Sequence, residues 1–178
     1  MAPSTPPANR AAIVRAARTG DREAFAELYR VYGAMVHGIC LARVPPQDAR
    51  DITQEVFIQA FRRLDQLRDD TAFGGWLAAL ARHAAADFHR RPERRVELHE
   101  LPDDLEAAER ADGGAEWVLV RIRGLPEAYR ETLMLRLVEG MSGPEIAERT
   151  GLEPGSVRVN LHRGMKLLRA ELGLEEGP

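Results

Sequence analysis

The chain has 178 residues, of which 44% are hydrophobic and 6% aromatic, enough for one medium domain or two small ones with real cores. Long stretches rich in Ala, Leu, Arg and Glu favour an all-α fold. No segment approaches the roughly 18 unbroken apolar residues of a membrane span, and the N-terminus lacks a signal-peptide pattern, so we expect a cytoplasmic protein without membrane insertion.

Catalytic and metal-binding patterns are missing from the sequence. The single cysteine, Cys40, lies in an apolar pattern with Val36 and Ile39, which predicts a buried thiol. The five histidines are scattered, and no CxxC, HExxH or phosphate-loop motif occurs. We therefore expect no metal, no cofactor and no enzymatic activity.

The net charge of −3 is unusual for a DNA-binding protein, but it is unevenly distributed. Eight acidic residues and one basic residue lie between Glu97 and Glu116, which gives this span −7 and leaves the rest of the chain at +4. Pro102 and the pair Gly113-Gly114 favour a flexible acidic linker over residues 93–115. Residues 1–9, small, polar and rich in proline, are expected to form a disordered tail.

Three helices are predicted for an N-terminal domain over residues 10–92. Asp21 caps the first, which carries apolar residues at three- and four-residue spacing until Pro45 and Pro46 end it. The second runs from about 46 to 67 and the third from about 73 to 91.

The second helix presents one apolar residue among polar ones. Its apolar side, which includes Phe57 and Phe61, is predicted to face the core, whereas Ile58 falls on the polar side. Such a residue can mark a protein docking site, although singly exposed apolar residues are common. The polar side is formed by Asp51, Gln54, Glu55, Gln59, Arg62, Asp65 and Gln66.

The third helix ends in the basic run His89-Arg90-Arg91 and carries Trp76 near its start. The basic end is either a second nucleic-acid patch or an ordinary solvated helix end. Trp76 is predicted to anchor the core.

A helix-turn-helix is predicted in a C-terminal domain over residues 116–178. Ser142 and Glu145 form a capping box, and Gly151 ends that short helix where a left-handed residue is needed. In the following helix, one stripe from Val157 to Leu172 is apolar, and the run from Ser156 to Ala170 holds four Arg or Lys and no acid. Such a face is suited to binding the phosphates of DNA. The alternative is an ordinary surface helix whose basic side is solvated.

Taken together, residues from Asp21 to Leu172 resemble the extracytoplasmic-function (ECF) sigma factors of the sigma-70 family. Residues 51–61 resemble the region 2.2 helix that docks on the β′ subunit of RNA polymerase. Residues 73–91 are similar to the region 2.3 and 2.4 helix that meets the promoter −10 box. Residues 125–133 resemble the opening of region 4, and residues 155–164 the helix that reads the −35 box.

The resemblance implies a set of contact residues for each partner. Polymerase binding is expected from Asp51, Gln54, Glu55, Ile58 and Arg62. Contact with the −10 element is expected from Arg68, Thr71, Phe73, Trp76, His83, Arg90 and Arg91. Contact with the −35 element is expected from Arg158, Asn160, His162, Arg163, Lys166 and Arg169.

Some positions depart from the family pattern. His83 stands where asparagine is usual, and Asn160 replaces a frequent arginine while offering an amide suited to adenine. Residues 68–73 match the loop in which relatives capture a flipped base.

The resemblance also implies the partners: the β and β′ subunits of core RNA polymerase, promoter DNA, and an anti-sigma factor, with the protein associated with the nucleoid. The acidic linker is expected to thread the polymerase's RNA path or to serve only as a spacer. The alternatives are a stand-alone helix-turn-helix regulator that acts as a dimer, and an acidic helical adaptor or sigma mimic that binds only proteins.

Overall fold

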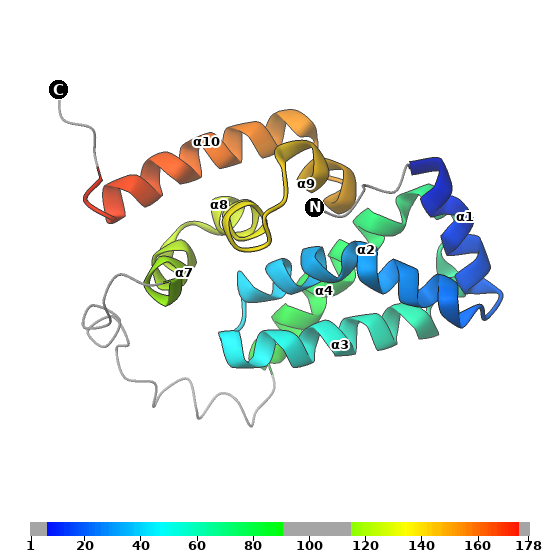
Figure 1. Ribbon diagram of the computed structural model, residues 1–178. Helices are drawn as coiled ribbons and strands as arrows, with labels where there is room; N and C mark the ends of the chain where they lie inside the picture. Colours follow the sequence, from blue (N-terminus) through cyan, green and yellow to red (C-terminus); the bar gives the residue numbers. More distant parts are fainter. Residues whose placement is uncertain (1–6, 91–114, 175–178) are drawn as a thin grey trace.

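The computed structural model describes residues 7–90 and 115–174 (Figure 1). Every regular element within these residues is a helix, so the predicted all-α fold is confirmed. The helices form an N-terminal unit, α1 to α4, and a C-terminal unit, α7 to α10. The predicted acidic linker lies outside the described residues except for Ala115, which begins α7.

The N-terminal unit is a four-helix arrangement in which α2 packs against α1, α3 and α4. Its helices are α1 (Pro7–Arg18), α2 (Arg22–Leu41), α3 (Pro46–Arg62) and α4 (Phe73–Arg90), with 3₁₀ turns at Leu64–Gln66 (η1) and Asp70–Ala72 (η2). The predicted cap at Asp21 is present, because its carboxylate accepts hydrogen bonds from the N–H groups of Glu23 and Ala24 at 2.8 and 3.1 Å. The predicted disordered tail was too long, since Pro7–Asn9 belong to α1.

The C-terminal unit holds the helix-turn-helix. It consists of α7 (Ala115–Gly124), α8 (Glu127–Leu133), a π-helical turn at Met134–Val138 (η3), α9 (Gly143–Thr150) and α10 (Pro154–Glu171). Both halves of the capping box between Ser142 and Glu145 are formed. Gly151 ends α9 with a φ of 73°, a left-handed conformation in which a residue with a Cβ would be strained.

The two units pack directly against each other, which the prediction of two domains on a flexible tether did not include. Helix α9 contacts α4 and α2, and η3 contacts α2. Apolar residues of both units belong to one continuous buried cluster. Figure 1 shows α9 between the N-terminal unit and α10, which lies on the outer side of the molecule.

Cys40 is fully buried in this core, and burial raises the pKa of its thiol to about 11. Because only the thiolate is nucleophilic, we expect the native protein to react with a disulfide reagent at pH 8 at least about 100-fold more slowly than free cysteine. Absorbance of the released thiolate measures the rate. The guanidinium-unfolded chain is the control and should react fully. Rapid stoichiometric modification of the native protein would contradict this prediction.

Candidate nucleic-acid and protein interfaces

An apolar groove of about 590 Å³ lies between α2 and α3. Three large side chains on it are unusually exposed: Ile58 at 52%, Phe61 at 48% and Tyr29 at 44%. Phe25 connects them to the core, since its ring packs on Phe61 with centroids 4.8 Å apart. The groove is lined by Arg22, Phe25, Tyr29, Gln54, Phe57, Ile58, Phe61 and Arg62.

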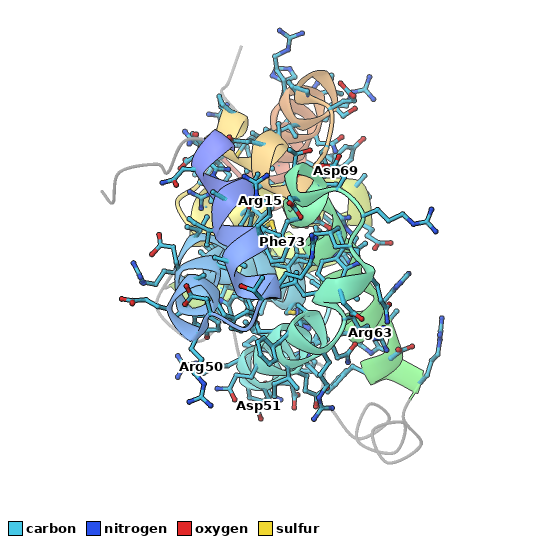
Figure 2. All side chains as sticks on the ribbon, turned by 90° about the vertical axis from the view of Figure 1, so that its right-hand side faces the viewer. Arg15, Arg50, Asp51, Arg63, Asp69 and Phe73 are labelled. Atoms are coloured by element: carbon cyan, nitrogen blue, oxygen red, sulfur yellow. The ribbon has the colours of Figure 1, made fainter. Side chains whose placement is uncertain are left out.

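Three of the predicted docking residues, Gln54, Ile58 and Arg62, line this groove. Asp51 is exposed at the start of the same face, and Figure 2 shows it beside Arg50 at the edge of the molecule away from Phe73. Glu55 is partly buried. The prediction that Phe61 faces the core was wrong, because α3 ends at Arg62 and its last turn leaves Phe61 on the groove rim.

Sequence reasoning missed Phe25 and Tyr29 as parts of this surface. Tyr29 stands off the apolar stripe of α2, whose buried members include Leu28 and Tyr32. The sequence signal that could have identified this surface was Tyr29 itself, an aromatic residue that lies outside the apolar stripe of α2.

Helix α10 presents the predicted basic face to solvent. Val157, Gly164 and Leu168 are buried beneath it. At Gly164 the packing is close, since a Cβ there would lie 3.0 Å from Leu133 and 3.1 Å from Tyr129 of α8. The exposed basic set comprises Arg158, His162, Arg163, Lys166 and Arg169, whereas Asn160 is half-buried.

A second groove, of about 840 Å³, runs between α9 and the first half of α10. Arg158 and Glu148 both contribute to its wall. The Glu148 carboxylate accepts a hydrogen bond from Arg10 of the N-terminal unit at 3.1 Å. The groove between α9 and α10 is therefore largely apolar and is bordered by the guanidinium of Arg158.

The predicted −10 residues lie around the start and the outer face of α4. Arg68, Thr71, His83 and Arg90 are exposed, whereas Trp76 is half-buried. Arg91 lies outside the described residues.

Phe73 has to be removed from the contact set. It is 1% exposed and packs against the ring of Tyr32 at 5.1 Å and that of Trp76 at 5.9 Å, so it holds the start of α4 in place without reaching solvent (Figure 2).

The loop before α4 is stiffened by its own side chains. Asp69 accepts hydrogen bonds from the N–H of Thr71 at 2.9 Å and from its hydroxyl at 2.7 Å, and these two bonds lower the pKa of Asp69. Arg18 of α1 donates to the carbonyl oxygens of Leu64 and Leu67 and to the carboxylate of Asp70. One guanidinium therefore ties the turn at Leu64–Leu67 to Asp70 in the loop.

Replacing Arg18 by alanine is expected to loosen this loop, because two carbonyl groups and a partly buried carboxylate lose their donor. We expect the amide hydrogens of Leu67 and Ala72 to exchange at least about tenfold faster. Arg15→Ala is the matched control, since Arg15 is 65% exposed at its side chain and lies 4.0 Å from Asp70. Unchanged exchange in Arg18→Ala, measured by mass spectrometry, would show that the loop holds its shape without this residue.

Among the residues that the structure describes, no group of three or more His, Cys, Asp or Glu side chains could hold a metal ion. Within the same residues, no helix has the length and apolar character to cross a membrane.

The chain is similar to known proteins over nearly its whole length. Residues 28–95 match the family model for sigma-70 region 2, and residues 115–168 that for sigma-70 region 4. Curated relatives include the ECF RNA polymerase sigma factor ShbA of Streptomyces griseus, 33% identical over 89% of this chain and 93% of the relative. The ECF RNA polymerase sigma-E factor of Escherichia coli K12 is 31% identical over 88% of this chain and 90% of the relative.

Among solved structures, CnrH in complex with the cytosolic domain of CnrY matches with a TM-score of 0.64 and 25% identity, covering 94% of this chain and 99% of that chain. The N-terminal unit corresponds to region 2, the C-terminal unit to region 4, and the chain belongs to the ECF sigma factors, which are alternative sigma factors of RNA polymerase.

Proposed function

We propose that this sigma factor binds core RNA polymerase through the groove between α2 and α3. The observation that carries the proposal is the exposure of Tyr29, Ile58 and Phe61 side by side on the groove. Aromatic and aliphatic side chains clustered in a pocket with a polar rim have the composition of an interface core. Gln54 and Arg62 supply polar groups at its edge. The β′ subunit is the expected partner.

We propose that α10 enters the major groove at the −35 element. Its first half carries Arg158, Asn160 and His162, the part of a recognition helix that meets base edges. Arg163, Lys166 and Arg169 follow, in the positions suited to phosphates. Because the phosphate contacts release counterions, the affinity for DNA should fall with rising salt concentration.

We propose that the second contact, at the −10 element, uses the loop of residues 68–72 and the exposed face of α4. Arg68 and Arg90 are the cationic groups proposed to contact the DNA backbone, and Thr71 and Trp76 are the residues proposed to hold an unstacked base. Holding such a base costs a few kcal/mol that the rest of the complex has to offset. His83 gives this face a ring nitrogen for base contact.

An anti-sigma factor is the further partner that we propose. The support is the solved relative CnrH, which is bound to the cytosolic domain of CnrY. A protein that covers the α2–α3 groove would compete with polymerase for the same apolar side chains.

Run-off transcription with core RNA polymerase on a library of genomic fragments tests the proposal and defines both promoter boxes. We expect initiation only when sigma and core enzyme are both present, and weak, unspecific DNA binding by the free protein. Tight sequence-specific binding without polymerase, together with failure to retain core enzyme in a pull-down, would favour a stand-alone regulator instead.

A further inference from the structure

Helix α10 carries an exposed valine that the core does not use. Val159 is 42% exposed, although it lies inside a regular helix. A β-branched side chain also forms a helix less readily than alanine. The hydrophobic residues of α10 that belong to the buried cluster or pack against it are Val157, Leu161, Met165, Leu168 and Leu172. Neither core packing nor helix propensity therefore accounts for a valine at position 159.

Val159 lies at the centre of the outward face of α10. Figure 1 shows this helix along the outer edge of the molecule, and its inner side contacts α8 and α9. At about 100° per residue, Val159 is about 200° around the helix from the buried Val157, so it points almost directly away from the core. The exposed Lys166 lies within about 20° of the same direction. Asn160, in contrast, is half-buried and lies only about 60° from Val157.

The methyl groups of Val159 are left uncovered by small residues in the preceding turn. A helical side chain leans towards the N-terminus of its helix, so the side chain of Val159 lies over Gly155 and Ser156. A Cβ at Gly155 would meet nothing within 4 Å, so the space above this turn is open. His162 and Arg163 are exposed neighbours on the following turn. The result is a small apolar site with polar and basic neighbours in the first half of the helix.

We propose that Val159 reads a thymine of the −35 element through the C5-methyl group of the base. This inference rests on the proposed function, because it assumes that the outward face of α10 enters the major groove. The one methyl group that base edges present in that groove is the C5-methyl of thymine, and apolar side chains recognise it by contact. Cytosine in its place would leave an amino group without a hydrogen-bond partner against the valine. Val159 therefore favours an A·T pair over a G·C pair at one position.

Replacing thymine by uracil removes this methyl group and leaves the base pairing unchanged. Each thymine of the −35 element, on either strand, is replaced in turn in a promoter that the run-off assay has defined. A second series of templates carries 5-methylcytosine in place of each cytosine. Initial rates are measured for holoenzyme, formed from the full chain and core RNA polymerase, at concentrations well below saturation. We expect uracil at one position to lower the rate of the parent about fourfold, the effect of about one buried methyl group.

Val159→Ala is expected to lower the rate on the thymine template by at least about fourfold and to reduce the response to uracil to less than about twofold. Because Val159 is exposed and alanine favours a helix, the fold should be preserved, which circular dichroism checks. Leu167→Ala is the matched control, since Leu167 is 40% exposed on the same helix but lies about 80° around it from Val159 and about two turns further along. This variant should keep both the rate of the parent and its response to uracil.

Equal rates of the parent on all uracil templates would overturn the inference while leaving the sigma function intact. A loss in Val159→Ala by the same factor on thymine and uracil templates would also overturn it, because Val159 would then contact something other than the methyl group. A response to 5-methylcytosine alone would show that a methylated cytosine is read in place of thymine. If the parent supports no transcription with core polymerase, the proposed function fails, and the inference fails with it.

Discussion

Replacement of Ile58 by aspartate is expected to weaken binding to core RNA polymerase by at least about 30-fold. Ile58 is 52% exposed on the wall of the groove between α2 and α3, where a partner would bury it. The variant loses apolar burial of about 1.5–3 kcal/mol and forces an unpaired carboxylate into the interface. Titration of labelled sigma factor with core enzyme measures the dissociation constant.

Leu174→Asp is the control for this prediction. Among the described residues, Leu174 and Ile58 are the two large apolar residues that are more than half exposed, and Leu174 lies beyond the end of α10, away from the groove. We expect its affinity for core enzyme to change by less than about threefold. Neither surface substitution should change the free energy of unfolding by more than about 0.5 kcal/mol. Equal affinities of Ile58→Asp and the parent would place the polymerase site elsewhere.

Local features of the fold were predictable from sequence because their causes lie within a few residues. The capping box at Ser142 needs only Glu145, and the end of α9 needs only a glycine at position 151. The inward stripe of α10 follows from the helical period alone, since Val157 and Leu168 are eleven positions, or about three turns, apart.

The two errors in the candidate sites occur where a helix ends or begins. Helical periodicity assigned Phe61 to the core, but α3 ends one residue later, at Arg62, and only Phe25 packs on the ring from α2, so Phe61 stays 48% exposed. Phe73 was assigned to DNA by resemblance, but it is the first residue of α4 and is enclosed by Tyr32 and Trp76. Burial at helix ends depends on tertiary neighbours that a periodic pattern does not contain.

The packing of the two units was not predictable from the acidic linker, whose composition favours separation. The contacts join residues far apart in sequence, such as Arg82 with Glu131 and His37 with Glu139. The glycines at 38 and 74 were a local sign, since a helix interior or first turn gains nothing from glycine unless another backbone or side chain comes close.

Replacing Arg158 by alanine is expected to remove discrimination at one or two positions of the −35 element. Each lost base contact is worth about 1–3 kcal/mol, or roughly 5- to 150-fold. Arg158 is exposed in the first half of α10 and does not contribute to the buried side of the helix, so the fold should be unaffected. Transcription by holoenzyme from templates carrying every single substitution in the −35 element measures the change.

Lys166→Ala separates base reading from phosphate binding on the same helix. Lys166 is exposed about two turns further along α10, where we propose that it meets the DNA backbone. Its loss should lower transcription from all templates by a similar factor and reduce the salt dependence of binding by about one phosphate contact, while the order of preference among templates stays the same. If Arg158→Ala behaved in that uniform way, Arg158 would be a phosphate contact, and base reading would fall to Asn160 and His162.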